Sequence, residues 1–369
     1  MDSIPVSKAE TLRRVVEHAP GEAARLAALL TLARHYVDVG DGVKGFAVAR
    51  EARSLALRLR DHAATSHALN SISISQYNRS EYVSAITTAL DARDYANRSG
   101  AKQAAGDSYY SIALSLFGLG LFAEAADVAE RGISSSAAGE EVRIRLTRLQ
   151  GILATTRGDM ASAERSFDAA IRLAARSTAT QLEASHALWA IAWLRHMDEQ
   201  YGGQPVIPAK LEAARRHLES ALAIARDEGD AYLVADRTAI LGVVSLLAHE
   251  WERARELLER ATAAAQALDY VRATVIATVY LSRLHLERGD APRAAELLAG
   301  AIEQARRGAA DDVIVYARTL RARALERQGR TEEAQRERRR AAEFREERAE
   351  SRRRSGVEAM RLIAPMLRE

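Results

Sequence analysis

One pattern, Ala-x-x-x-(Phe/Leu)-x-x-Ala, returns about every forty residues and limits what this chain can fold into. Its clearest copies begin at Ala163, Ala214, Ala254 and Ala294. On a helix, positions 0, +4 and +7 share a face, so each copy puts two small residues and one bulky residue on a single stripe. Such a stripe lets a second helix approach closely. The recurring unit is therefore predicted to be a helix that packs on another helix.

The pattern keeps its register over most of the chain. The first small residue of each copy falls at Gly45, Ala85, Ala125, Ala163, Ala214, Ala254, Ala294 and Ala334. The intervals are 40, 40, 38, 51, 40, 40 and 40 residues. A constant period of this length indicates a repeat array in which each unit contacts only its neighbours.

Two further signals accompany the copies. Twelve positions before seven of them stands another small residue, at Ala33, Ser73, Ala113, Gly151, Gly242, Ser282 and Ala322. Five positions before the same seven, where a turn is expected, stand Gly40, Ser80, Gly120, Gly158, His249, Gly289 and Gly329. Glycine suits the left-handed residue that closes a helix, and Asp41, Asp159 and Asp290 suit the cap of the next helix. The predicted unit is a helix, a tight turn and a second helix.

This arrangement resembles the tetratricopeptide repeat, most clearly in Leu241-Gly242…Ala254…Leu258…Ala261. The resemblance implies an all-α fold, a right-handed superhelix (α-solenoid) of about eight helix-turn-helix repeats. It covers residues 22–345, preceded by a capping helix in residues 1–21. Residues 346–369 are expected to form a charged exit helix with a short amphipathic tail.

The period of 40 residues is longer than the usual ~34 of the family, so each helix is expected to be longer by most of a turn. Repeats of about this size are similar to those of bacterial signalling proteins. These include maltose-regulator-like transcription factors and the sensory part of GGDEF diguanylate cyclases.

Composition agrees with a helical array and excludes several kinds of protein. Aromatic residues make up only 5% although 48% are hydrophobic, which favours close helix packing over a β-sandwich. The absence of cysteine rules out disulfides and thiolate metal sites, and a cytoplasmic location is expected. Every apolar run falls far short of the roughly 18 to 20 residues that span a bilayer, so we expect no membrane association.

One interval of 51 residues interrupts the register between Ala163 and Ala214. The excess of eleven residues falls around Tyr201–Pro208, in a loop expected over residues 200–209 that holds two glycines and two prolines. Pro208 is expected to start the next helix, where its missing N–H costs nothing. Two interpretations stay open: a tolerated surface insertion, or a flap over one mouth of the groove.

The sequence contains no catalytic motif that fits its context. Gly118-Leu119-Gly120 begins a weak match to a dinucleotide-binding fingerprint, but that fingerprint works only at a strand-to-helix turn. The nine histidines are scattered and show no metal-ligand spacing. We therefore expect a protein that is not an enzyme, with no catalytic residue, no cofactor and no metal site.

By the resemblance, the first helix of each pair lines the concave inner wall, where a ligand groove would lie. The candidate groove residues are Arg34, Asn70, Tyr77, Tyr110, Phe117, Arg145, Arg148, Trp189, Trp193 and Arg283. Arg145 and Arg148 are either a fork for a carboxylate or phosphate or a solvated face. Trp189 and Trp193 are either an aromatic wall for a ligand or packed core. The hydrogen-bonding side chains between Ser66 and Ser84 indicate a poorly packed repeat or a polar recognition patch.

A charged segment follows the array, with fourteen Arg and eight Glu in residues 318–354. It predicts a long helix that ends at Ser355-Gly356 and can pair with a second copy. The leading hypothesis is a module that binds a protein, a peptide or a small regulatory ligand in its groove. It would be the sensory part of a bacterial signalling protein, with a diguanylate cyclase preferred by the resemblance. The alternative is nucleic-acid binding through the Arg-rich helix, which the interleaved glutamates disfavour.

Overall fold

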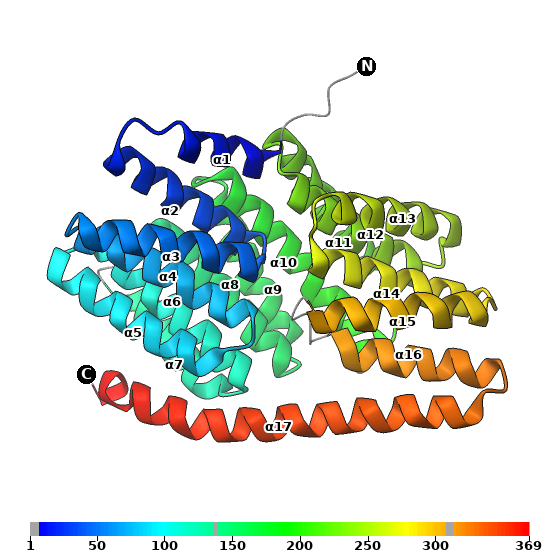
Figure 1. The fold of residues 1–369 in the computed structure, drawn as a ribbon. Coiled ribbons are helices and arrows are strands. Elements are labelled where there is room, and N and C mark those ends of the chain that lie inside the picture. Colours follow the sequence, from blue (N-terminus) through cyan, green and yellow to red (C-terminus); the bar gives the residue numbers. More distant parts are fainter. Residues whose placement is uncertain (1–6, 136–138, 202, 308–312, 369) are drawn as a thin grey trace, which may run out of the picture. The chain divides into compact units, whose positions relative to one another are not determined.

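The computed structural model describes residues 7–135, 139–201, 203–307 and 313–368, and all regular structure in these ranges is helical. They form two compact units. Unit 1 comprises Met1–Ser185, Glu228–Asp230 and Arg352–Glu369, and unit 2 comprises His186–Asp227 and Ala231–Ser351. Figure 1 follows the chain through both units. Of the predicted capping segment and loop, residues 1–6 and 202 lie outside the described residues.

Each unit is a series of helix pairs joined by short turns. In unit 1 the helices are α1 (Lys8–Glu17), α2 (Glu22–Asp38), α3 (Gly42–Arg58), α4 (His62–Asn78), α5 (Tyr82–Ser99), α6 (Lys102–Leu119), α7 (Phe122–Ser134), α8 (Glu140–Thr156), α9 (Met160–Ala174) and the start of α10 (Ala179–Met197). Unit 2 continues with the rest of α10, then η1 (Glu199–Tyr201), α11 (Pro208–Asp227), α12 (Ala231–Leu247), α13 (Trp251–Ala267), α14 (Val271–Glu287), α15 (Ala291–Arg307) and α16 (Ile314–Arg327). The last helix, α17 (Thr331–Arg368), contributes residues to both units.

The predicted helix-turn-helix unit is confirmed. Every copy of the small-bulky-small pattern lies in the second helix of a pair, and the small residue twelve positions earlier lies in the first. All seven predicted turn residues have positive φ, between 59° at His249 and 87° at Gly289. The three predicted caps accept hydrogen bonds from backbone N–H groups: Asp41 from Lys44, Asp159 from Ser162, and Asp290 from Arg293. Pro208 starts α11 as predicted.

Small residues let the paired helices approach closely. A Cβ added at Gly151 of α8 would lie 2.8 Å from the ring of Phe167 in α9. One added at Gly242 of α12 would lie 2.7 Å from the side chain of Leu258 in α13. Both bulky side chains are almost fully buried. The spacing of small and bulky residues therefore fixes the packing of each pair.

Replacing Gly151 with Ala is expected to destabilise the protein by about 1–3 kcal/mol, because the buried Phe167 ring has to move. Gly300 of α15 is the matched control, since a Cβ there meets nothing within 4 Å. Gly300→Ala is expected to stabilise by roughly 0.5–1 kcal/mol through helix propensity alone. Urea unfolding followed by circular dichroism measures both changes, and two stabilising substitutions would refute the close packing.

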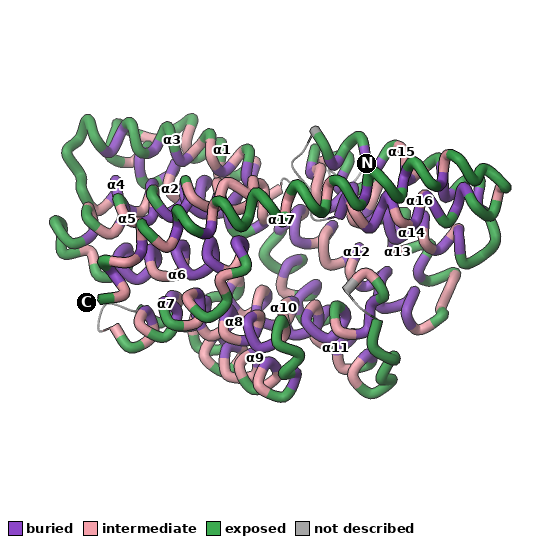
Figure 2. Tube along the Cα trace, turned by 90° about the horizontal axis from the view of Figure 1, so that it is seen from below, coloured by how far each residue is buried: buried purple, intermediate pink, exposed green. Residues whose placement is uncertain are grey.

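The prediction that the charged helix ends at Ser355-Gly356 is wrong, because α17 continues without a break to Arg368. Exposed residues dominate the middle of α17 (Figure 2), but its last turns pack into the core of unit 1. There Ala359 and Ile363 are 0% exposed and Met366 is 3% exposed. Burial of this stripe offsets the cost of about 1 kcal/mol that Gly356 brings to a helix.

Arg131 of α7 fixes the end of α17. Its Nη1 and Nη2 donate to the carbonyl oxygens of Met366 and Leu367 at 3.3 and 2.9 Å. These carbonyls belong to the last turn of the helix, where no intrahelical donor remains. The amphipathic tail is therefore part of unit 1 and does not leave the array as an exit helix. No helix in the described ranges is both long enough and apolar enough to cross a membrane.

Candidate functional site

The first helices of the pairs form the inner layer of unit 1. Within the described residues, α2 packs on α4, α4 on α6 and α6 on α8, whereas consecutive second helices make almost no contact with each other. Helix pairs that touch through one layer curve toward that layer. The first helices therefore line the inner side of the unit, where the sequence placed its candidate residues.

A buried charged network joins α2, α6 and α8 in this inner layer. Asp107 on α6, 2% exposed, accepts a hydrogen bond from Nη2 of Arg145 on α8. Its Oδ2 lies 3.9 Å from Nη1 of Arg34 on α2, and Arg34 Nε donates to both oxygens of Asp38 at 3.2 Å. Burial alone would lower the pKa of Arg34, but Asp38 and Asp107 raise it above its ordinary value. Asp107 therefore interacts with two arginines, Arg145 and Arg34.

Arg145 and Arg148 are 3% and 7% exposed, so this pair is not a solvated face. The guanidinium of Arg145 lies 5.2 Å from the ring centre of Tyr110, and its Nε and Nη1 are buried without a hydrogen-bond partner among the described residues. Arg148 Nη1 donates to the carbonyl of Gln181 on α10 at 3.3 Å. Burial lowers the pKa of Arg148 and, although Tyr110 opposes this, the neighbouring charge of Arg145 lowers it further.

Gln181 adds an acceptor to this group of donors. It is 4% exposed, and its side-chain Oε1 is buried with no donor among the described residues. Each unmade buried hydrogen bond costs about 1–3 kcal/mol. We call Arg145, Arg148 and Gln181 the inner triad. It combines unused donors and an unused acceptor on adjacent first helices.

The central polar side chains of α4, among them Asn70 and Ser73, are neither poorly packed nor free for recognition. Ser73 Oγ donates to the carbonyl of Ala85 on α5 at 2.7 Å. Asn70 Nδ2 donates to the carbonyl of Ala104 on α6 at 2.8 Å, and its Oδ1 accepts from Ser108 at 3.1 Å. These buried bonds join α4 to both neighbouring helices. They explain why residues of low helix propensity occupy this helix.

Two aromatic candidates of unit 1 lie against its apolar core. Tyr77 and Phe117 are partly buried and pack on the same cluster as the tail of α17. Their rings lie 5.7 Å from those of Tyr82 and Phe122 respectively. In this position they contribute to helix packing, apart from the inner triad.

Trp189 and Trp193 are packed inside unit 2, at 4% and 6% exposed. Trp189 stacks on His217 of α11 with ring centres 4.2 Å apart. The ammonium of Lys210, also on α11, lies 4.8 Å from the ring centre of Trp193. The interpretation as packed core therefore accounts for both rings. An open aromatic wall is not formed, because α11 covers them.

Two histidines face each other beside these rings. Nδ1 of His186 lies 2.8 Å from Nδ1 of His217, and burial lowers the pKa of His186 below its ordinary value. The unfolded chain therefore binds the proton more readily, so stability is expected to fall as the pH drops below about 6.5. Urea unfolding at about pH 7.5 and pH 5.5 should show a smaller acid-induced loss in His186→Gln than in the parent. An equal loss in both proteins contradicts this assignment.

Arg283 lies in a second charged site, on the inner layer of unit 2. Asp198, which follows α10 and is 1% exposed, accepts hydrogen bonds from Tyr280 Oη at 2.9 Å and from Arg283 Nη1 at 3.2 Å. Glu199 of η1 accepts from Tyr316 Oη at 3.1 Å. An acidic turn directly before the predicted loop is therefore bonded to α14 and α16.

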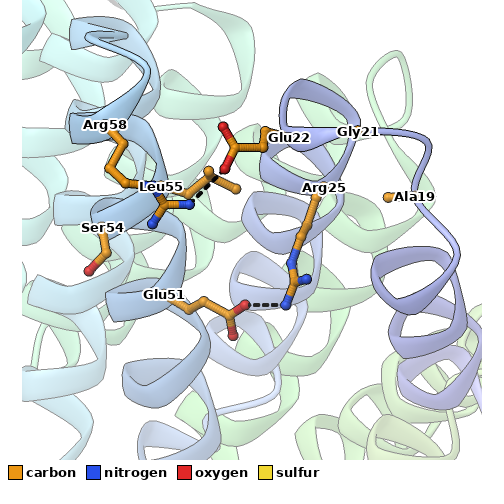
Figure 3. Close-up of a pocket in the computed structure, with 8 residues that line it drawn as sticks. All are labelled: Ala19, Gly21, Glu22, Arg25, Glu51, Ser54, Leu55 and Arg58. Carbon is orange, nitrogen blue, oxygen red and sulfur yellow. Dashed lines mark hydrogen bonds and ion pairs between the residues drawn. The ribbon is translucent and has the colours of Figure 1, made fainter.

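A surface hollow of about 500 Å³ lies between the start of α2 and the end of α3 (Figure 3). Its charged groups already form pairs, Arg25 with Glu51 at 2.8 Å and Arg58 with Glu22 at 2.9 Å. All four side chains are at least half exposed, so solvent screens them strongly. The hollow therefore offers less to a charged ligand than the buried inner triad.

No protein-family profile matches the sequence, and no curated protein matches it either. Solved structures do share its fold. The apo form of the quorum sensor NprR from B. thuringiensis is 16% identical, with a TM-score of 0.54 over 91% of each chain. A Rap protein complexed with Competence and Sporulation Factor is 15% identical, with a TM-score of 0.53 over 93% of this chain and 98% of that one.

The human IFIT1 dimer with m7Gppp-AAAA is 13% identical, with a TM-score of 0.55 over 90% of this chain and 76% of that chain. Likeness at such identities concerns the fold alone. It agrees with the repeat period, the positive-φ turns and the all-helical described residues. The chain has a tetratricopeptide-like helical repeat fold, an α-solenoid.

Proposed function

We propose that unit 1 is a peptide-binding regulatory module that holds an extended acidic segment against the inner triad. The observation that carries the proposal is that two donors of Arg145 and the side-chain acceptor of Gln181 are buried and unused. A peptide offers both a carbonyl and an N–H, and a carboxylate fits the fork of a guanidinium. A fully ionised phosphate monoester has no N–H or O–H to donate, so it would use the donors and leave Gln181 unpaired.

The charges around the triad support an acidic ligand. Asp107 holds Arg145 and leaves Arg148 without a carboxylate hydrogen bond in the described residues. Burial and the charge of Arg145 both lower the pKa of Arg148, so an incoming carboxylate would relieve an unfavourable interaction. We therefore assign Arg148 as the main anion-binding residue and Arg145 and Gln181 as its partners in holding the backbone.

The structural neighbours are consistent with a regulatory role, since they include a quorum sensor and a Rap protein bound to a factor. In this proposal the protein is not an enzyme, and its output passes to a signalling partner. The sensory part of a bacterial signalling protein of the diguanylate cyclase type remains our preferred choice by the resemblance of the long repeats. Because the apolar face of the α17 tail is buried in unit 1, we do not assign dimerisation to that face.

Nucleic-acid binding through the Arg-rich part of α17 has less support. Glu337, 3% exposed, pairs with Arg318, Arg321 and Arg340. Glu333 pairs with Arg330 at 2.7 Å. These carboxylates cancel much of the positive field that phosphate binding would need.

An array of short synthetic peptides, probed with labelled protein, tests the proposal. We expect bound peptides to be enriched in Asp, Glu or a free C-terminal carboxylate. Arg148→Gln should lose about 10- to 100-fold in affinity for them, the usual value of a charged hydrogen bond. Arg143→Gln, an exposed position on the same helix, is the matched control and should bind like the parent.

A second variant keeps the test decisive if Arg148→Gln unfolds. Gln181→Met removes the side-chain acceptor of the inner triad together with its amide donor, and should weaken the same peptides by several-fold. Bound peptides without acidic groups, or an array on which nothing binds, would refute the proposal. Preferential binding of a DNA duplex that Arg148→Gln leaves unchanged would favour the α17 alternative.

A further inference from the structure

The inner layer of unit 2 carries a group of donors arranged around two carboxylates. Tyr280 and Arg283 of α14 bind Asp198, and Tyr316 of α16 binds Glu199. Arg323 of α16 donates from Nη1 to both oxygens of Glu199, at 3.0 and 3.1 Å. The backbone N–H of Gln200 donates to Asp198 at 2.9 Å and holds the turn closed. Each carboxylate oxygen of Asp198 and Glu199 therefore accepts at least one hydrogen bond.

The donors and the carboxylates come from different segments of the chain. The donors lie on regular repeats, in which α12 packs on α14 and α14 on α16. The carboxylates come from the only long interval of the array, the 51 residues between Ala163 and Ala214. Asp198 and Glu199 lie directly before the predicted loop, and with them in place the side chain of Arg283 is 12% exposed. The repeats therefore form the site, and this acidic turn fills it.

The chemistry of the donors fits ionised carboxylates. Burial alone would raise the pKa of Glu199, but Arg283 and the hydrogen bond from Arg323 lower it below its ordinary value. Burial raises the pKa of Tyr316, and the nearby acids add to this, so its hydroxyl stays protonated and can donate. Two guanidinium groups and two phenols together match a pair of adjacent acidic side chains better than one small anion.

We propose that Tyr280, Arg283, Tyr316 and Arg323 form a second binding site for an acidic peptide segment, which the chain's own Asp198–Glu199 turn occupies as a tethered competitor. A tethered group acts at an effective concentration of about millimolar. With an intrinsic affinity of the turn on the order of micromolar, an external peptide would therefore bind roughly 100- to 1,000-fold more weakly while the turn is in place. This site is separate from the inner triad of unit 1 and does not depend on it.

The test uses the full chain and a fluorescein-labelled, blocked peptide that contains adjacent Asp and Glu. Glu199→Gln removes one competing charge and keeps Asp198, whose burial makes it a poor choice for substitution. We expect Glu199→Gln to bind the peptide at least about tenfold more tightly than the parent in fluorescence anisotropy. Adding Arg323→Gln, at a side chain that is 45% exposed and so tolerant of change, should abolish the gain.

Two controls separate this site from the others. The gain should persist in an Arg148→Gln background, because that residue belongs to unit 1. A peptide with Asn and Gln in place of Asp and Glu should bind the parent and Glu199→Gln equally weakly. The proposal is overturned if Glu199→Gln gains no affinity, or if its gain survives Arg323→Gln. Neither outcome would affect the peptide-array test of the inner triad in unit 1.

Discussion

Replacing Asp107 with Ala is expected to destabilise unit 1 by about 3–5 kcal/mol, the usual cost of removing one partner of a buried ion pair. Arg145, 3% exposed, would lose its only carboxylate hydrogen bond in the described residues. Arg34 would also lose a carboxylate 3.9 Å away. Native-state hydrogen exchange, followed by mass spectrometry of peptides from α6 and α8, measures this loss of stability in unit 1. Asp91→Ala, at an exposed position of α5, is the matched control.

A double variant distinguishes an unpaired charge from lost packing. Asp107→Ala combined with Arg145→Met removes both charges and keeps an apolar side chain of similar length. We expect it to regain most of the stability that Asp107→Ala loses. If the double variant is as unstable as the single one, the network does not act as a paired charge.

Replacing Ile363 with Ala is expected to cost about 2–5 kcal/mol and to release the end of α17. Ile363 is 0% exposed and lies in the core cluster of unit 1. Val357, 59% exposed on the same helix, is the matched control, and Val357→Ala should change stability by less than about 0.5 kcal/mol. Release should also accelerate tryptic cleavage at Arg352, Arg353 and Arg354. Equal cleavage in both variants would contradict the docking of the tail.

The repeat and its turns could be predicted from the sequence because they depend on local rules. The stripe from Ala163 to Ala170 defines a helical face without reference to distant residues. Ser80 and His249 were identified as turn positions only through the register, since positive φ is uncommon for residues other than glycine. Periodicity thus supplied information that residue preference alone could not.

The parts that the sequence did not predict depend on contacts between distant residues. The apolar stripe of Ile363 and Met366 indicated an amphipathic helix, but not that it would pack in unit 1. Asp198 and Tyr280 are 82 residues apart, and only the fold brings them together. Whether Trp189 is open or covered depends on α11, whose His217 stacks on it. Of the second site, Arg283 could be placed on the inner face from the sequence.

The central claim is that the inner triad binds an acidic peptide, and isothermal titration calorimetry of the best array peptide tests it most directly. The parent and Arg143→Gln should bind with the same affinity, and binding should weaken between about 50 and about 300 mM salt because it includes a charge pair. Arg148→Gln should bind about 10- to 100-fold more weakly, with hydrogen exchange of α8 no longer slowed by the peptide. Equal affinity of Arg148→Gln and Arg143→Gln would contradict the account.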